Sequence, residues 1–192
     1  SCTVIDFSLN ESFIKIELIY LTNTVPPKCP LMKVQPRFEK CPKLSLVGKK
    51  LLMSIIENRT QELWKSFMPK RGQITNRVGE EYYSVEVYSG LDYFKAFDPI
   101  KKFEKWAAVK VNDYNSVPET MEQLIIPEGD YAVFLYKGES SNVTSFYQYI
   151  FTEWLPNSEY ELDDRPHFAV MAEKYKNNDP SSEEEIWIPI RE

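Results

Sequence analysis

Two strand-like segments of this sequence place a carboxylate and an aromatic ring on the same face. Glu86 and Tyr88 alternate in one of them, and Glu185 and Trp187 alternate in the other. A carboxylate is costly to bury alone, and a cationic ligand offsets that cost. Ring faces add a cation–π attraction of about 0.5–2 kcal/mol each. Acids and rings in this pattern predict a pocket for flat, lipophilic cations.

Aromatic side chains are frequent, with 12 Tyr, 11 Phe and 4 Trp among 192 residues. Because a Tyr hydroxyl needs a partner, many Tyr residues favour a half-wet cavity, and an ordinary aromatic-rich core is the alternative. Tyr147 fits either a groove rim or a helix surface. Glu185 ends an acidic run, and such runs are usually solvated. The ligand-binding candidates are Glu86, Tyr88, Trp106, Tyr136, Glu185, Trp187, Ala169 and Met171.

The same groups allow a hydrolase as an alternative. Glu86 or Glu185 would act as general base or nucleophile, while a hydroxyl of Tyr88 or Tyr136 donates a proton. His167 is the single histidine, and a lone strand histidine is more often structural. The sequence has no GxGxxG, Walker, GxSxG or HExxH motif. These observations favour a binding domain and leave the enzyme question open.

Composition excludes several classes of protein. The formal net charge of −6 repels phosphate backbones, so we expect no nucleic-acid partner. One histidine and three cysteines without CxxC spacing predict no metal site, no cofactor and a reducing, cytoplasmic location. No uncharged apolar run reaches the roughly 18 residues of a membrane span.

The first 31 residues differ from the rest of the chain. They end in a proline-rich stretch that cannot lie inside a helix or a central strand. We expect residues 1–31 to be an N-terminal extension outside the core domain, which would comprise residues 32–192. An extra strand over residues 13–21 is the alternative.

From residue 32 onward the periodicity repeats one order of elements. Each half reads strand, helix, strand, strand, and each helix is closed by a proline, Pro69 or Pro156. The expected helices span 55–68 and 141–155, and the expected strands span 43–54, 82–89, 104–111, 167–175 and 184–190, while 122–137 reads as a pair of strands with a turn at 127–130. One half could not cover its sheet alone. The predicted fold is therefore α+β, with duplicated βαββ units in pseudo-twofold symmetry and helices on one side of antiparallel sheets. A central groove on the other side would expose Glu86, Tyr88, Trp106, Glu185 and Trp187.

The order of motifs resembles one known family. The motifs are LVG (46–48), LW (63–64), FMP (67–69), YSVEVY (83–88), KWAAVKV (105–111), IPEGDYAVFLYKG (126–138), EWLPNSEYE (153–161) and EEIWIPI (184–190). From residue 37 to the end the chain is similar to the GyrI-like, or AraC-type effector-binding, small-molecule-binding domains. The resemblance implies two βαββ units around a central cleft.

The resemblance also implies a range of functions. Members joined to DNA-binding domains act as transcriptional ligand sensors, many of them for bulky, lipophilic and often cationic compounds. Stand-alone members bind drugs, resemble gyrase inhibitors or hydrolyse cyclopropane-containing toxins. We see no helix-turn-helix segment here, so we expect a stand-alone domain that captures hydrophobic, aromatic, including cationic, small molecules. It would sequester the ligand or signal through a partner regulator protein. A hydrolase of strained-ring toxins and a gyrase-inhibitor-like role in protein binding are the alternatives.

One position departs from the family pattern. Relatives often carry a Glu where this chain has Ala169. Internal symmetry aligns residues 84–89 with 167–172, so that Glu86 corresponds to Ala169. The acid is thus retained in one half only, which weakens both cation binding and any hydrolase mechanism that needs it.

Overall fold

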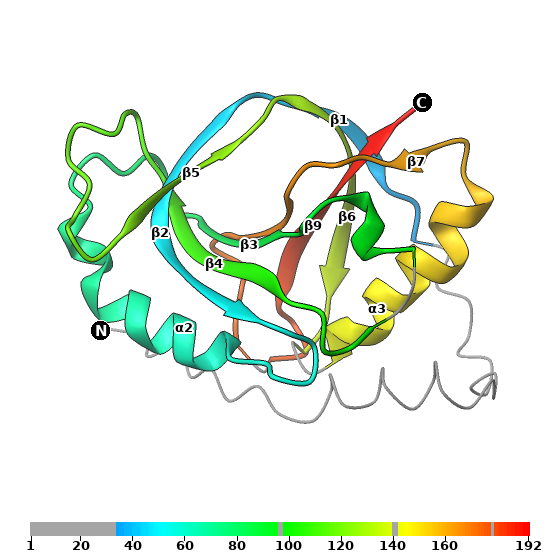
Figure 1. The fold of residues 1–192 in the computed structure, drawn as a ribbon, viewed down its shortest axis with the longest axis horizontal. Coiled ribbons are helices and arrows are strands. Elements are labelled where there is room, and N and C mark those ends of the chain that lie inside the picture. The colour runs from blue at the N-terminus through cyan, green and yellow to red at the C-terminus, as the bar shows by residue number, and fades with distance from the viewer. Residues whose placement is uncertain (1–33, 96–97, 140–141, 178) are drawn as a thin grey trace.

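The computed structural model of the chain describes residues 34–95, 98–139, 142–177 and 179–192. The expected extension at residues 1–31, with its alternative strand, lies outside the described residues and stays a prediction. The described elements form a curled antiparallel sheet with two main helices on one side (Figure 1).

The sheet contains eight strands in one continuous path, ordered β1-β6-β9-β8-β3-β4-β2-β5, and β7 pairs with β9 off this path. The strands are β1 (Arg37–Cys41), β2 (Leu44–Met53), β3 (Tyr82–Val87), β4 (Phe103–Lys110), β5 (Glu122–Ile126), β6 (Gly129–Lys137), β7 (Glu161–Leu162), β8 (His167–Met171) and β9 (Glu183–Arg191). The helices are α2 (Thr60–Phe67) and α3 (Val143–Tyr149), with short helical segments η1 (Met68–Gln73), η2 (Leu91–Tyr93), η4 (Ile150–Trp154) and η5 (Leu155–Asn157).

The predicted duplication is confirmed. One unit is β2-α2-β3-β4 and the other is β6-α3-β8-β9, and β3 pairs with β8 where the units meet. Val85 pairs with Trp106 in the first unit, as Phe168 pairs with Trp187 in the second. Val85 and Phe168 also pair with each other, so the pseudo-twofold axis passes between them. This register makes Glu86 the symmetry equivalent of Ala169, as the internal alignment predicts.

The helices differ from the expected ranges at their N-terminal ends. The first begins at Thr60 rather than residue 55, because side chains bond to the backbone before it: Ser54 Oγ accepts from Glu57 N, and Asn58 Oδ1 accepts from Thr60 N. The second runs as α-helix from Val143, then through a π-helical and a 3-10 segment to residue 157. Strands β1 and β5 lie outside the two units, one at each end of the sheet.

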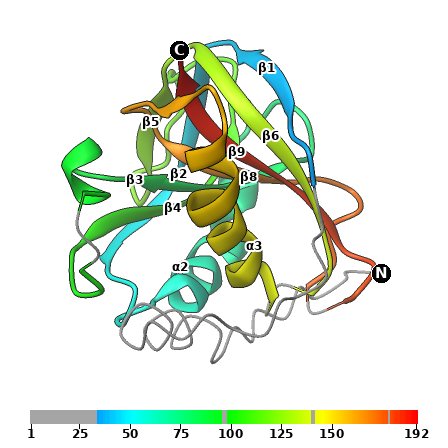
Figure 2. The same cartoon turned by 90° about the vertical axis from the view of Figure 1, so that its right-hand side faces the viewer.

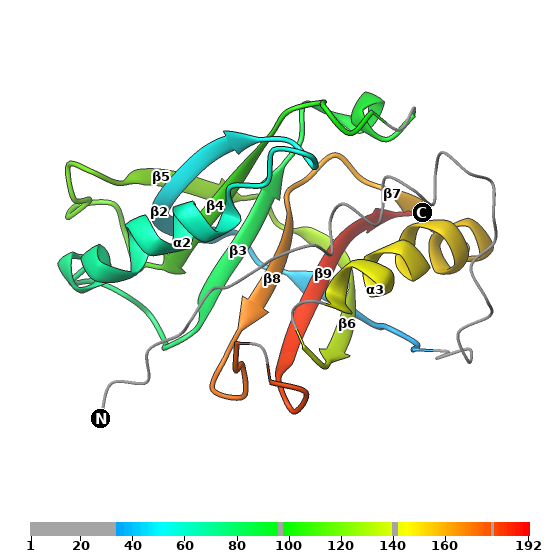
Figure 3. The same cartoon turned by 90° about the horizontal axis from the view of Figure 1, so that it is seen from below.

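Both helices pack on the same face of the sheet, as Figures 2 and 3 show. We call this the helix face. On it α2 buries Leu63, Trp64 and Phe67 against β2 and β4. In the same way α3 and η4 bury Phe146, Ile150 and Trp154 against β6 and β9. The helical spacing of these apolar residues produces the packing. Trp64, Phe67 and Trp154 are core residues, as expected.

The opposite face, which we call the curl face, lines the inside of the curved sheet and is filled by its own side chains. Its buried residues are Cys41, Leu44, Leu46, Tyr83, Val85, Trp106, Ala108, Ile126, Tyr131, Val133 and Phe168. These side chains contact one another in a single buried cluster, so the protein itself fills the inside of the curl. The expected groove on the side away from the helices is therefore wrong.

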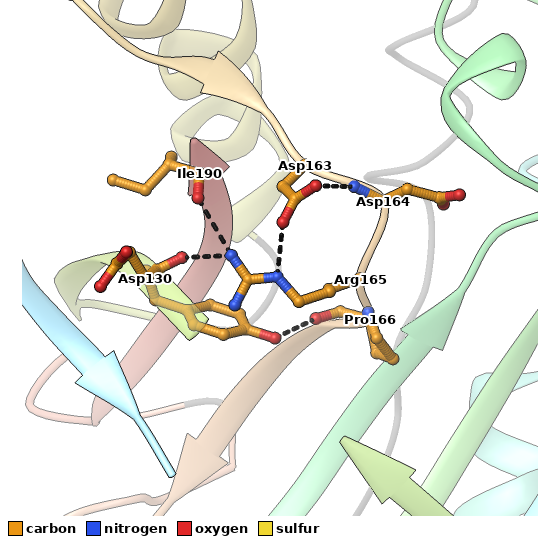
Figure 4. Close-up of polar contacts among 7 residues, drawn as sticks. Asp130, Asp163, Asp164, Arg165, Pro166 and Ile190 are labelled. Carbon is orange, nitrogen blue, oxygen red and sulfur yellow. Dashed lines mark hydrogen bonds and ion pairs between the residues drawn. The ribbon is translucent and has the colours of Figure 1, made fainter. Parts of the chain in front are cut away.

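Arg165 makes polar contacts with several segments of this sheet (Figure 4). Its Nη2 donates to the backbone oxygens of Asp130, at 2.8 Å, and of Ile190, at 3.0 Å, while Nε donates to Asp163 Oδ2 at 2.7 Å. The guanidinium also covers the ring of Tyr131, 4.8 Å from its centroid. One side chain thus ties β6, β9 and the segment that enters β8, since all three contribute partners.

The position of Arg165 requires a glycine at 129. A Cβ placed there would lie 1.7 Å from Arg165 Nη1, and the φ of Gly129 is +156°. We expect Gly129→Ala to lower the free energy of unfolding by about 2 kcal/mol, because the guanidinium must leave its carbonyl partners. Urea unfolding measures this change. Gly72→Ala is the matched control, since nothing lies within 4 Å of a Cβ at Gly72. Equal stabilities of the two variants would contradict the assignment.

Candidate functional site

The predicted groove residues are divided between the two faces of the sheet. Residues directly opposite on paired strands share a face, and Glu86 pairs with Lys105 while Val85 pairs with Trp106. Trp106 belongs to the curl face and Ala107 to the core beneath α2. Glu86 therefore lies on the helix face, and the expected grouping of Glu86 with Trp106, Glu185 and Trp187 is wrong. The alternation of residues along one strand does not show which residues of the neighbouring strand lie on the same face of the sheet.

On the curl face each tryptophan already has a carboxylate and a cation from the protein itself. Trp106 Nε1 donates to Glu104 Oε2 at 3.2 Å, and the Nζ of Lys50 lies 5.2 Å from the centroid of the ring.

The second half repeats this arrangement. Trp187 Nε1 donates to Glu185 Oε2 at 3.2 Å, and the guanidinium of Arg37 lies 5.9 Å from the ring centroid. Glu185 also accepts from Arg37 Nη2 at 2.7 Å. The acid-plus-ring pattern seen in the sequence is thus satisfied internally at Glu185 and Trp187.

The helix face carries a central polar cluster, which we define as Glu86, Lys105 and Glu184. Glu86 and Lys105 form an ion pair whose side chains are only 14% and 12% exposed. Burial raises the pKa of Glu184 to about 7, Lys105 opposes this rise and Glu86 adds to it. Two carboxylates, one from each half, therefore interact with the same ammonium group.

Three tyrosines lie within the electrostatic reach of this cluster. Burial, followed by the charge of Glu86, raises the pKa of Tyr88. The pKa of Tyr147, on α3, is raised by burial and then by Glu86 and Glu184. Burial and Glu184 raise the pKa of Tyr175. All three phenols stay protonated at neutral pH, so each keeps a hydroxyl group that can donate a hydrogen bond.

Other sequence candidates occupy the same face in different roles. Ala169 and Met171 are buried there on β8, and Met171 belongs to the core beneath α2. Tyr136 packs under α3, and its hydroxyl donates to the backbone oxygen of Glu139 at 2.7 Å. Tyr136 is thus held by the loop that follows its strand.

His167 is a buried, uncharged member of an aromatic stack. It is the cross-strand neighbour of Glu86, and burial lowers its pKa to about 3. Its ring stacks on Phe94 at 5.3 Å and on Phe151 at 5.9 Å, with the edge of Tyr88 at 5.0 Å. Because the imidazole is neutral at physiological pH and held between rings, its role here is packing.

A cavity of about 180 Å³ lies where β3 ends and β8 begins. Phe94 and His167 of the aromatic stack line this cavity, and so does Tyr88, one of the three tyrosines near the polar cluster. Its lining residues are Val87, Tyr88, Leu91, Phe94, Asp163, Asp164, Arg165, Pro166 and His167. Tyr88 lines this cavity, and Glu86 is not among the lining residues.

Sequence reasoning missed Lys105 and Glu184. Both break an apolar face: Lys105 alternates with Ala107 and Val109, and Glu184 alternates with Ile186 and Ile188. An ionisable residue on the buried face of a strand was the signal that could have revealed them. The acidic run 183–185 obscured it, because such a run is typical of a solvated surface.

In the described part of the chain, no group of three or more His, Cys, Asp and Glu residues is arranged to hold a metal ion. The described helices also include none that is long and apolar enough to cross a membrane.

The raised pKa of Glu184 predicts how stability depends on pH. A carboxyl that titrates near 4.5 when unfolded and near 7 when folded keeps its proton longer in the folded state. Its contribution to stability is present at low pH and is lost as pH rises from about 4.5 to 7. We therefore expect Glu184→Gln to gain stability relative to wild type across this window, as measured by urea unfolding at several pH values.

Glu183→Gln provides the control of opposite sign. The hydrogen bond from Lys137 lowers the pKa of Glu183, so this variant should lose stability relative to wild type as pH rises. Parallel pH profiles for Glu184→Gln and wild type would show that Glu184 is not buried as described.

Comparison with known proteins gives a family and a set of related structures. The model of the GyrI-like small molecule binding domain matches residues 34–191. The transcriptional regulator BrlR of Pseudomonas aeruginosa is 26% identical over 161 residues, which cover 83% of this chain and 57% of BrlR. The chain thus spans little more than half of that regulator.

Two solved structures share the fold at low sequence identity. SAV2435, solved with tetraphenylphosphonium bound, has a TM-score of 0.57 and 16% identity, over 82% of this chain and 94% of that one. The C-terminal domain of EcmrR has a TM-score of 0.59 and 15% identity, over 84% and 99% of the two chains.

Proposed function

The chain belongs to the GyrI-like small-molecule binding domain family, and from this premise we propose that it binds lipophilic aromatic cations at the central polar cluster. The family establishes small-molecule binding. The class of ligand and the residues that hold it are our proposal, and they rest on the charges, burial and rings of the helix face.

The charge of the cluster is the observation that carries this proposal. Glu86 and Glu184 contribute two negative charges when ionised, and Lys105 contributes one positive charge. The balance is −1, so a single ligand cation neutralises the cluster. Because the carboxylates are largely removed from water, the attraction is stronger than at an open surface.

The surrounding rings favour a large, apolar cation. Tyr88, Tyr147 and Tyr175 lie near the carboxylates, and each ring face attracts a cation by about 0.5–2 kcal/mol. Apolar ligand surface adds about 25 cal/mol for every Å² removed from water. A phosphonium or ammonium centre that carries aromatic groups combines both contributions.

The related proteins agree with this class of ligand. Tetraphenylphosphonium, the compound bound in the SAV2435 structure, is a lipophilic aromatic cation. BrlR is a transcriptional regulator with which this chain shares 161 aligned residues. We infer an effector-binding role, in which the domain sequesters such a ligand or reports it to a regulator protein.

The hydrolase alternative receives less support from the geometry. It requires a free carboxylate beside a free hydroxyl. Glu86 is ion-paired with Lys105, and the hydroxyl of Tyr136 is bonded to the loop at Glu139. These contacts favour binding over turnover. The gyrase-inhibitor-like role in protein binding stays a prediction.

Removal of the Glu86 charge tests the proposed site. We expect Glu86→Gln to weaken tetraphenylphosphonium binding by about tenfold or more, because it removes one anion and leaves Lys105 unpaired to repel the ligand. Isothermal titration calorimetry measures the change. Glu185→Gln is the matched control, since it makes the same substitution on the curl face, and it should change the affinity by about twofold or less. A larger loss in Glu185→Gln than in Glu86→Gln would place the ligand on the curl face instead.

Binding should also depend on pH near neutrality. Because the pKa of Glu184 is about 7, this carboxyl gains its charge as pH rises past that value. We expect tetraphenylphosphonium affinity to increase several-fold between about pH 6 and pH 8, and to lose most of that increase in Glu184→Gln. A pH-independent affinity in the wild-type protein would remove Glu184 from the site.

A further inference from the structure

We propose that Lys105 is a tethered competitor for the ligand's cation, so that the site selects large aromatic cations over small ammonium ions. The ammonium group of Lys105 is already paired with the carboxylate of Glu86. A ligand cation must therefore either bind while this ion pair is intact or displace Lys105 from Glu86. This inference rests on the proposed function and names the class of cation that the same site admits.

The position of Lys105 is fixed by the sheet. It faces Glu86 directly across β3 and β4, and its Nζ contacts Glu86 Oε1. Both side chains are largely buried, so neither is free to turn into bulk solvent without leaving its partner. Breaking such a pair by removing one partner is costly because it leaves an uncompensated charge.

The internal duplication supplies a comparison within the same molecule. Because Trp106 corresponds to Trp187, Lys105 corresponds to Ile186, just as Glu86 corresponds to Ala169. Ala169 and Ile186 face each other across β8 and β9 in the same register as Glu86 and Lys105. The acid and the base are thus present together in one half and absent together from the other. This pattern supports the assignment of Lys105 as the built-in counter-ion of Glu86.

Lys105 also interacts electrostatically with the second acid of the cluster, Glu184. Its charge lowers the pKa of Glu184 against the effect of burial, so the ammonium group that is paired with Glu86 also acts on the second carboxylate. With Glu86 neutralised by Lys105, the residual negative charge of the cluster resides on Glu184. A ligand is therefore attracted by the residual negative charge of the cluster and does not find an unpaired carboxylate at Glu86.

This arrangement discriminates between cations by size and hydration. A tethered group competes at an effective concentration of about millimolar or above without paying the entropy of association. A small ammonium ion brings the same charge as Lys105 and little apolar surface, so it gains nothing by exchange. A large aromatic cation gains ring contacts and buried apolar area, which do not require Glu86 to be free.

The test compares two probes on variants of the full chain. We would titrate tetraphenylphosphonium and tetramethylammonium into wild type and Lys105→Met by calorimetry at about pH 8, where Glu184 is ionised. We expect Lys105→Met to bind tetramethylammonium at least about tenfold more tightly, and tetraphenylphosphonium by a smaller factor. The ratio of the two affinities should therefore fall, which a purely structural role of Lys105 would not produce.

Three further variants isolate the effect. Lys50→Met removes a lysine and its ion pair with Glu104 on the curl face of the same sheet, so it matches the change in net charge. It should leave the ratio unchanged, and so should Lys105→Arg, which keeps the cation. Lys105→Met combined with Glu86→Gln should lose the gain, because no carboxylate has been released. Thermal unfolding verifies folding, and Lys105→Gln replaces Lys105→Met if the latter does not fold.

The outcomes separate this inference from the proposed function. If wild type binds tetraphenylphosphonium but the neutral variant at Lys105 shows an unchanged ratio, the competitor role is overturned and the proposed function stands. If Lys50→Met changes the ratio equally, net charge is responsible and the inference is also overturned. If neither wild type nor the variant binds either probe, both proposals fail. Binding by the variant alone would support Lys105 as a competitor but would contradict the proposed function, because the natural chain would not bind the ligand.

Discussion

The antiparallel pairing of β3 with β8 is the contact on which the rest of the structure depends. It joins the two duplicated units into one sheet, with Val85 and Phe168 opposite each other at the pseudo-twofold axis. Each unit brings a helix to the same face, and Figure 3 shows the strands at the axis, β3 and β8, between α2 and α3. The pairing thereby fixes Glu86 beside His167 and sets which side chains of the two halves can meet.

The sequence was sufficient to predict the elements of the two units, but not to predict which face of the sheet each side chain occupies. Periodicity located the helices through Trp64 and Trp154, and prolines located their ends, because these signals are local. The relation between Glu86 and Trp106 depends on the β3–β4 register, and a shift of one residue would exchange the two faces. No local pattern determines that register, which is why the expected groove was placed on the wrong side of the sheet.

The curl face explains why acid-plus-aromatic spacing overpredicted ligand contacts. The pairs Glu104–Trp106 and Glu185–Trp187 have the chemistry of a cation site, and the protein fills each with its own cation, Lys50 or Arg37. The physical rule was sound, since a buried acid beside a ring does recruit a positive charge. The pattern by itself does not distinguish a ligand cation from a lysine or arginine that lies near in space and distant in sequence.

The helix face departs from the pseudo-twofold symmetry at the central polar cluster. Ala169 is the symmetry equivalent of Glu86 and carries no charge, while β9 supplies a second carboxylate, Glu184, at the position equivalent to Phe103 of β4. Each half thus contributes one carboxylate, from non-equivalent positions, and Lys105 neutralises the one at Glu86. The remaining charge lies on Glu184, which acts on Tyr147 in the core beneath α3 and on Tyr175, which packs against the core beneath α2. A symmetric ligand bound here would therefore be held asymmetrically, with its cationic centre drawn toward Glu184 and its apolar groups left to the rings.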